Sequence, residues 1–330
     1  MKKVKFLAMA LSVALCAGFT ACGDDDDDKD GVIDGGSVDT SRIPANAVYT
    51  TQAGNRVVVK RIGSTDFTYN TDGFCTKVGS SLNIFYSGGL IVYGQDTQAK
   101  FNMNGQGFIT GIDATYNSKN SSYSSTGTSK IRFAYNGNGY LTKMTAEGTS
   151  TYMDLDSGTD SYETYTGEMN LTWDGTKLIK ASSVANGEED GAKYRETSEY
   201  VIQSSGVANT LGQYTLAYSE FFDDEFYSLS LVGLYGKAPS EFIQSIAETY
   251  SEIDEEEEEN GSSVTTYQYE FNSNGTISTE TENESGSYSY SYDILANTLL
   301  APRHGNGELK KGVRKHGFGP NSTRMRRGRM

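Results

Sequence analysis

One short motif recurs along this chain and constrains its fold more than any other feature. Two aromatic or large apolar residues stand two positions apart, followed by Asn or Asp, a short turn with Gly, and a few strand-forming residues. Asn, Asp and Gly accept the positive φ angles that tight hairpin turns require, and residues two apart share one face of a strand. Each copy therefore predicts a β-hairpin, and the copies are Phe67–Val78, Phe101–Ile109, Phe133–Met144, Leu171–Ile179 and Tyr269–Ile277.

The amino-acid usage of residues 45–292 extends this pattern to a whole domain. All 23 tyrosines lie in this stretch, and Pro239 is the only proline between Pro44 and Pro302. Aromatic residues favour strands, and a low proline content permits long ladders. Strand signals recur at intervals of about 8–12 residues. We therefore expect a mainly β fold: a large antiparallel meander of repeated hairpins that forms an open or partly closed barrel-like sheet.

The stretch from Asn209 to Asn260 breaks the hairpin pattern. Its segment Phe226–Gly236 is the most apolar of the domain and fits a short helix or a buried plug. Apolar residues then recur at helical spacing after Pro239, a residue tolerated in the first turn of a helix. We therefore predict one or two short helices around residues 224–255, and the acidic run 255–259 is expected to form a loop. The predicted helical stripe is Phe242, Ile243, Ile246, Ala247, Tyr250 and Ile253.

Residues 1–21 have the order of a secretory signal peptide. Basic residues precede the twelve-residue apolar run Phe6–Ala17, which is too short to span a bilayer because a span needs about 20 residues. Small residues then precede Cys22, an arrangement similar to a bacterial lipobox, whose cysteine is diacylated. Acyl chains contribute about 0.8 kcal/mol per buried methylene, so several chains on Cys22 would form a stable anchor. We predict lipid attachment at Cys22 and an acidic tether over residues 22–44.

The aspartate run behind Cys22 supports three interpretations. It is similar to the surface-export signal of Bacteroidetes-type lipoproteins, which would place the protein on the outer face of the outer membrane. It also suits a solvated, self-repelling tether. Because Ser37 stands where an EF-hand has its bidentate Glu, any calcium binding is expected to be weak. The residues with the oxygen spacing of a calcium loop are Asp26, Asp28, Asp30 and Asp34, around Gly31.

Histidine and cysteine usage excludes several classes of enzyme. The two histidines, His304 and His316, both lie beyond residue 292. The domain therefore cannot build a Ser-His-Asp or Cys-His apparatus, or a histidine-bound zinc or iron site. Cys75 is the single cysteine left after the leader and the lipid anchor, so no intrachain disulfide forms. Because Cys75 falls in a predicted strand, we expect a buried, inert thiol.

Charge is distributed unevenly along the chain. Residues 22–292 hold 41 acidic and 16 basic side chains, a net of −25, and residues 293–330 hold 9 basic and 2 acidic ones, a net of +7. The acidic body argues against nucleic-acid binding, which uses Lys and Arg on phosphates. The basic tail suits an arm for anionic lipid headgroups or polysaccharide. Its composition clashes with the body, and we predict that residues 293–330 are disordered or non-native.

The hairpin repeats, the segment Leu231–Ser240 and the terminal hairpin together resemble a known family. It is a Bacteroidetes lipoprotein family of unknown function that is described as having a porin-like β fold. The resemblance covers roughly residues 45–292 and implies a β fold and a surface location. The family carries no catalytic assignment, so the resemblance implies no catalytic residue.

The leading hypothesis is a non-catalytic, surface-tethered protein that binds a glycan or a protein partner. Tyrosine-rich sheets supply flat amphipathic faces suited to sugars. A cluster of exposed tyrosines with Trp173 on one sheet face would support binding, whereas their burial would remove this case. No cofactor is expected beyond weak calcium, and the anchor partner is the outer-membrane lipid.

Two alternatives remain open from the sequence. A glycan-active enzyme would need a carboxylate pair, and Asp174 beside Trp173 is the first residue to inspect, although its place in the repeat favours a turn-forming role. A membrane pore would need strands that alternate apolar and polar residues with aromatic girdles. Ile131, Phe133 and Tyr135 alternate in this way, but the acidic body and long polar spacers suit a water-exposed domain better.

Overall fold

The computed structural model describes residues 40–41, 43–94, 96–119, 123–155, 158–222, 226–254, 258–283 and 285–295, all of which belong to the unit Met1–Ala296. The short helices of this part are the 3₁₀ turn Tyr86–Gly88, α1 (Leu216–Ser219) and α2 (Tyr227–Leu231). The strands in chain order are β1 (Tyr49–Thr50), β2 (Arg56–Ile62), β3 (Thr65–Tyr69), β4 (Cys75–Val78), β5 (Leu82–Phe85), β6 (Leu90–Tyr93), β7 (Thr97–Met103), β8 (Ile109–Lys119), β9 (Tyr123–Tyr135), β10 (Leu141–Asp154), β11 (Asp160–Asp174), β12 (Lys177–Glu189), β13 (Ala192–Ala208), β14 (Glu241–Ile253), β15 (Glu258–Phe271), β16 (Ile277–Glu282) and β17 (Gly286–Ile294).

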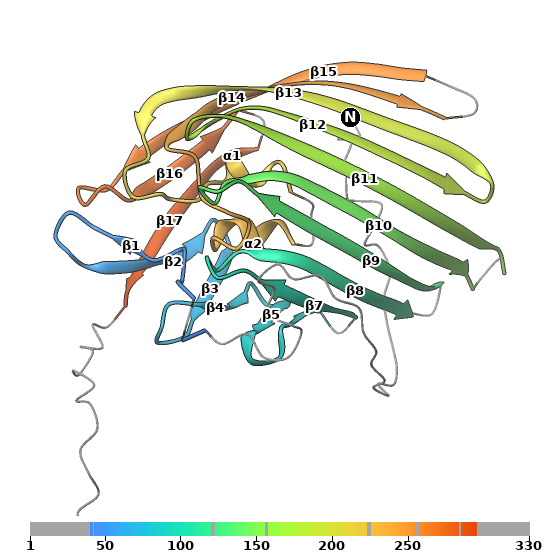
Figure 1. Cartoon of the computed structure of the whole chain (residues 1–330), viewed down its shortest axis with the longest axis horizontal. Helices are drawn as coiled ribbons and strands as arrows, with labels where there is room; N and C mark the ends of the chain where they lie inside the picture. The colour runs from blue at the N-terminus through green and yellow to red at the C-terminus, as the bar shows by residue number, and fades with distance from the viewer. Residues whose placement is uncertain are drawn as a thin grey trace, which may run out of the picture. The chain divides into compact units, whose positions relative to one another are not determined.

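The strands β2 to β17 form a closed antiparallel meander. Each pairs with the next strand along the chain, and β17 returns to pair with β2, where Tyr290 lies opposite Ile62. The short β1 adds to β2 at one edge. The predicted mainly β meander is therefore confirmed, and the 16 strands β2 to β17 close into a barrel, which Figure 1 shows.

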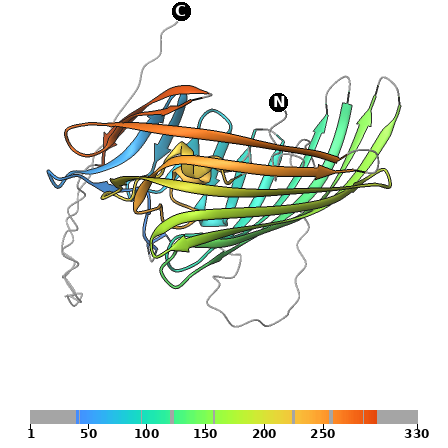
Figure 2. The same ribbon diagram turned by 90° about the horizontal axis from the view of Figure 1, so that it is seen from above.

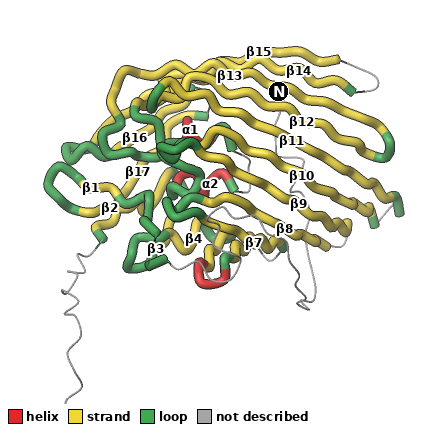
Figure 3. The backbone as a smooth tube through the Cα atoms, viewed as in Figure 1, coloured by secondary structure: helices red, strands yellow, loops and turns green. Residues whose placement is uncertain are grey.

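The barrel wall is much longer on one side than on the other. The strands β2 to β7 have four to seven residues, whereas β8 to β15 have 11 to 17. The long strands therefore extend well beyond the short ones (Figures 1 and 3). We call the end that contains all 16 strands the plugged half and the continuation of β8–β15 beyond it the open half.

The Asn-containing turns of the repeat lie in the plugged half and have a common geometry. The side-chain oxygen of Asn136 accepts hydrogen bonds from the backbone N–H groups of Asn138 (3.0 Å) and Tyr140 (3.1 Å). Gly139 follows with a φ of 87°, which only glycine adopts without strain. Asn70 and Asn104 make the same pair of bonds in their own turns. These turns confirm the predicted hairpins and explain why the motif repeats.

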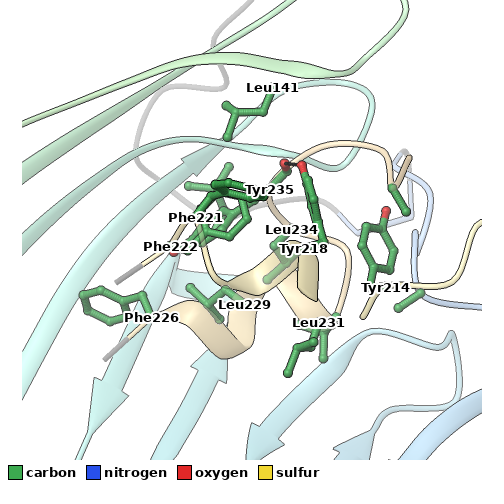
Figure 4. Close-up of a cluster of buried hydrophobic side chains, with 14 of the residues drawn as sticks. Leu141, Tyr214, Tyr218, Phe221, Phe222, Phe226, Leu229, Leu231, Leu234 and Tyr235 are labelled. Carbon is green, nitrogen blue, oxygen red and sulfur yellow. Dashed lines mark hydrogen bonds between the residues drawn. The ribbon is translucent and has the colours of Figure 1, made fainter. Parts of the chain in front are cut away.

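The segment between β13 and β14 fills the plugged half. Its helices α1 and α2 lie inside the ring of strands (Figures 1 and 2). The predicted short helix and the predicted buried plug are therefore both correct for this segment. No helix in the described part of the chain has the length and apolar character needed to cross a membrane. The labelled side chains of Figure 4 that are buried here are Tyr214, Tyr218, Phe221, Phe222, Phe226, Leu229, Leu231, Leu234 and Tyr235.

A buried carboxylate fixes the plug to the wall. Glu280 on β16 is fully buried and accepts hydrogen bonds from the backbone N–H groups of Leu216 and Ala217, both at 2.9 Å, and from the Tyr290 hydroxyl. Gln213 adds a second attachment, since its side chain accepts the N–H of Ile277 at 2.9 Å. Burial raises the pKa of Glu280, although its hydrogen bonds oppose that shift. The first turn of α1 is thus held against β16 and β17.

The predicted helix after Pro239 is wrong, because Glu241–Ile253 forms the strand β14. The helical spacing was produced by a strand irregularity. A register shift next to Ser204 buries both Phe242 and Ile243, so two neighbouring residues face the core before strict alternation resumes at Ile246. The predicted loop 255–259 is likewise shortened, because Glu258 already belongs to β15.

The two faces of the long strands differ in chemistry. Every second residue of a strand faces inward, and Ile131, Phe133 and Met144 are buried at such positions. The outward positions carry threonines, other polar residues and ion pairs, such as Arg132 with Asp113 at 2.7 Å and Lys143 with Glu168 at 2.7 Å. The outer face of the long strands is therefore mainly polar, although Val201 and Val264 are exposed apolar residues on it, and most apolar residues lie inside.

Candidate functional site

The residues that the sequence assigned to lipid and calcium lie outside the described residues. They are Cys22 and the four aspartates Asp26, Asp28, Asp30 and Asp34. Lipid attachment and weak calcium binding therefore stay predictions. Within the described part of the chain, no group of three or more His, Cys, Asp or Glu side chains is arranged to hold a metal ion.

Trp173 and Asp174 have different surroundings although they are neighbours. The Trp173 indole N–H donates to the carbonyl oxygen of Leu141 at 2.7 Å, and its ring lies 4.5 Å from the ring of Tyr140. Asp174 is exposed at the last position of β11, opposite Lys177. This position agrees with the turn-forming role that its place in the repeat predicted.

The thiol of Cys75 is buried, as predicted. Its residue is 3% exposed, and burial raises the thiol pKa to about 12. A thiol with such a pKa is almost fully protonated at neutral pH and is therefore a poor nucleophile.

Most tyrosines do not form the exposed face that sugar binding would need. Many lie in the core, and Trp173 packs against that core. Among the described tyrosines, only Tyr152 and Tyr162 have large exposed fractions, 40% and 52%. The case for a flat face of tyrosines around Trp173 is therefore removed.

The open half instead presents an acidic inner face. Register and alternation place six glutamate side chains on the inward side of β11 to β15. Ala185, which lies directly opposite one of them on β12, and Ile202, further along β13, are buried on the same side. The six residues are Glu163, Glu189, Glu196, Glu248, Glu252 and Glu259.

No cationic side chain compensates these carboxylates from the described strands of the open half. Every lysine and arginine of β8–β15 falls at an outward position. Each of them lies next to an inward residue on its own strand and opposite an outward residue on the neighbouring strand. Several outward acids are paired with cations: Lys130 lies 3.3 Å from Glu147, and Lys180 forms an ion pair with Glu199. The wall therefore separates charge, with cations outside and unneutralised carboxylates inside.

Glu196 is the most unusual member of the inner face. Its residue is only 6% exposed, and the described residues provide it with no hydrogen-bond or ion-pair partner. Burial raises the pKa of the Glu196 carboxyl to about 7, with a further contribution from Glu252 and Glu163. A buried polar group is normally hydrogen-bonded, so this carboxyl has unused capacity to bind.

Glu163, Glu189, Glu248 and Glu259 accept hydrogen bonds from neutral groups. Tyr194 donates to one oxygen of Glu163 at 2.7 Å, and Ser150 donates to the other at 3.0 Å. Burial and the neighbouring carboxylate raise the pKa of Tyr194, so its phenol stays protonated and remains a donor. Tyr250 donates to Glu259 at 3.3 Å. These bonds orient the carboxylates without neutralising them.

Glycines opposite the tyrosines shape this face. Tyr194 lies across from Gly187, and Tyr250 lies across from Gly261. A methyl group at either glycine would overlap the facing ring. The same pairing occurs for Tyr116 with Gly127 and for Tyr165 with Gly148. Each ring therefore lies flat against the neighbouring strand, a cross-strand aromatic–glycine pairing that fixes its position.

The acidic inner face was not identified from the sequence. A signal for it exists, because Glu248-x-Tyr250-x-Glu252 alternates as a strand does. The helix assigned to these residues concealed that alternation. The inward direction depends moreover on the register with β13, which a single strand does not reveal.

Comparison with known proteins finds a limited structural similarity and no match by sequence. No protein-family model matches the chain, and no curated protein matches it by sequence. Among solved structures, the chain is similar to the crystal structure of a porin-like protein from Bacteroides uniformis, with a TM-score of 0.41 and 15% sequence identity. The match covers 76% of this chain and 99% of the other protein. The lipoprotein family therefore remains a resemblance.

Proposed function

We propose that this protein is a non-catalytic binding protein, held at the outer membrane by lipid on Cys22 and facing outward, that binds a glycan or a protein partner. The observation that carries the proposal is the mainly polar outer face of the long strands, whose exposed apolar residues, such as Val201 and Val264, form no continuous band. A barrel inside a bilayer needs an outward apolar band about 25 Å tall. Here the outward positions of β9 and β10 include Thr128, Lys130 and Glu147. A body of this kind stands in water and needs a separate anchor.

The interior gives a second argument against a pore. Ile131 and Phe133, whose alternation fitted a membrane strand, are 3% and 7% exposed and face inward. The plug also fills the plugged half and is attached to the wall through Glu280. A water-filled channel has a polar lumen, whereas this end of the barrel has an apolar core.

Cell fractionation of Cys22→Ser tests the anchor. The wild-type chain is expected in the membrane fraction and the variant in the soluble fraction without detergent. Cys16→Ser is the matched control, because Cys16 precedes the predicted cleavage site, and it should fractionate as the wild type. If the Cys22→Ser chain resists a carbonate wash of the membranes, the body itself is inserted and the proposal fails.

Ligand screening of the full-length protein tests the binding role. A glycan array, run with and without calcium, is expected to separate sugar recognition from a contribution of the aspartates Asp26 to Asp34. The burial of most tyrosines supports the protein partner over the glycan. Silence on the array together with no interaction after cross-linking at the cell surface would contradict a binding role.

One observation favours an enzyme as the second candidate. Glu196 and Glu252 lie directly opposite each other on β13 and β14, and the pKa of Glu196 is raised to about 7. Two carboxyl groups with different pKa values are the usual equipment of glycoside hydrolysis. Hydrolysis of a labelled glycan that disappears in Glu196→Gln would establish this candidate in place of a purely binding role.

A further inference from the structure

Like charges face each other directly on the acidic inner face. Glu163 lies opposite Glu189 between β11 and β12. Glu196, Glu252 and Glu259 form one row across β13, β14 and β15. Equal charges at directly opposite positions destabilise a sheet, and the outer face of the same strands carries pairs of opposite charge instead. The inner face is thus stabilised by any cation that binds between its carboxylates.

The β13 end of this row holds a carboxyl that lacks a partner. Glu196 is more than nine-tenths buried, faces inward, and receives no hydrogen bond or ion pair from the described residues. Desolvating an unpaired charge is unfavourable. A cationic or hydrogen-bond-donating group that binds to Glu196 therefore stabilises the folded protein. The phenols of Tyr194 and Tyr250 border this position and add aromatic surface for a cation.

The acidic inner face is larger than a single amine. Glu252 lies four positions after Glu248, which is about 13 Å along β14 at about 3.3 Å per residue. Four strand spacings of about 4.8 Å separate β11 from β15, or about 19 Å. An area of this size suits a chain with several positive charges at intervals.

The edge of β15 indicates which kind of ligand fits the acidic inner face. Residues 258–265 pair with β14 on one side, but β16 joins the other side of β15 only from Tyr267 onward. Among the described residues, this part of β15 has no strand on its second edge (Figure 1). An unpaired edge offers backbone N–H and C=O groups to an extended peptide. Glu259, the β15 member of the carboxylate row, lies on this edge strand.

We propose that the open half binds an extended peptide segment rich in lysine or arginine, which adds to the edge of β15 and places its cationic side chains among Glu196, Glu252 and Glu259. This inference rests on the binding role proposed above and names its ligand class. Backbone pairing supplies the docking geometry, and the carboxylates select for positive charge. The outward lysines and arginines of β8–β15 are turned away from this ligand.

Fluorescence anisotropy with defined probes tests the inference. The probe is a fluorescein-labelled decapeptide of alternating Lys and Thr, titrated with the full-length protein in mild detergent at pH 8 and low salt. The double variant Glu196→Gln/Glu252→Gln is expected to weaken binding at least about tenfold, because two charge-assisted contacts are lost. Glu147→Gln, on the outer face, is the matched control and should bind within about twofold of the wild type.

Two further probes separate the parts of the inference. The same peptide with N-methyl groups on alternate residues should bind about tenfold more weakly, since it cannot complete a ladder. A chitosan hexamer offers amines without a peptide backbone and should bind more weakly than the decapeptide. Equal affinity of the double variant and the wild type, equal affinity of the N-methylated probe, or tighter binding of chitosan overturns the inference. A positive glycan array or cross-linked partner with no peptide binding leaves the proposed function intact and removes only this ligand class.

Discussion

The plugged half and the open half are continuous along the same eight long strands, yet they enclose different chemistry. In the plugged half, inward residues such as Met169, Leu171 and Leu178 are buried against the plug. A few residues further along the same strands, inward positions are occupied by Gly187, Tyr194 and Glu196. Hydrophobic burial stabilises the plugged half, whereas the open half exposes carboxylates to any ligand that enters it.

A buried carboxylate occurs in both halves, and its partners make the difference. Glu280 in the plugged half accepts three hydrogen bonds from Leu216, Ala217 and Tyr290. Glu196 in the open half has neighbours of its own charge, Glu252 and Glu163. The first carboxylate is satisfied by the fold and holds an element in place. The second is left for a group that the fold does not supply, which is the property expected of a binding residue.

Removing the plug attachment should have the largest effect on stability. Glu280→Ala leaves two backbone N–H groups and the Tyr290 hydroxyl without an acceptor, at about 1–3 kcal/mol for each buried group. We expect a loss of at least about 3 kcal/mol in the free energy of unfolding, measured by urea denaturation. Glu259→Ala in the open half is the control and should stay within about 0.5 kcal/mol of the wild type, because that side chain is exposed. Similar losses in both variants would show that the two halves do not differ in this way.

The pH dependence of stability should separate the halves next. The folded pKa of Glu196 is raised to about 7, so the folded state holds its proton more tightly than the unfolded state. Its charging therefore lowers stability as the pH rises from about 4.5 to about 7, and no loss is present below that window. At about 1.4 kcal/mol per pKa unit, a rise from 4.5 to about 7 corresponds to about 3.5 kcal/mol. Screening by solvent in the open half reduces this value, so Glu196→Gln should be on the order of 2–3 kcal/mol more stable than the wild type at pH 8.

Glu196→Gln and the wild type should have nearly equal stability at pH 4, where both side chains are neutral. The groups that face Glu196 are Glu252 on β14, Glu163 on β11 and the uncharged Ala185 on β12. Thermal denaturation at pH 4, 6 and 8 measures the effect. A constant difference between the two proteins across this range would mean that Glu196 titrates normally.

The sequence predicted the plugged half better than the open half, for a physical reason. Turn chemistry is local, so Asn136 and Gly139 reveal their hairpin within four residues. The apolar plug was also visible as a run of Phe226–Gly236. Closure of the barrel was not, because Tyr290 pairs with Ile62 across more than 200 residues and no local signal specifies that pairing. The inward carboxylates depend on such pairings too, and the bulge at Phe242 and Ile243 imitated a helix.

Filling a glycine of the open half should have a smaller effect than either carboxylate change. A methyl group at Gly187 overlaps the Tyr194 ring, and such overpacking costs about 1–3 kcal/mol. We expect Gly187→Ala to lower the free energy of unfolding by this amount and to break the hydrogen bond from Tyr194 to Glu163. Gly137→Ala in a turn of the plugged half is the control, since nothing lies within 4 Å of its added methyl, and it should be close to neutral.

A double-mutant cycle tests whether the clash is the cause. Tyr194→Ala removes the ring, so Gly187→Ala should be nearly neutral in that background. The free energies of unfolding of all four proteins give the coupling directly. A full additive loss in the double variant would place the cost of Gly187→Ala in the backbone of β12, apart from the ring.

The smallest effect is expected on the outer face, where several acids of the same strands are paired with lysine or arginine. Glu147 lies 3.3 Å from Lys130, and both side chains are largely exposed. Exposed ion pairs contribute about 0–1 kcal/mol and are screened by salt, so Glu147→Gln should lower stability by less than about 1 kcal/mol, and 0.5 M NaCl should abolish the difference. Glu252→Gln should have the opposite sign, because it removes a charge that faces Glu196 and Glu259. Measured side by side by thermal denaturation at pH 8, the two variants report the sign of the local field on each side of one wall. A stabilising Glu147→Gln or a destabilising Glu252→Gln would mean that cations and carboxylates are not separated across it.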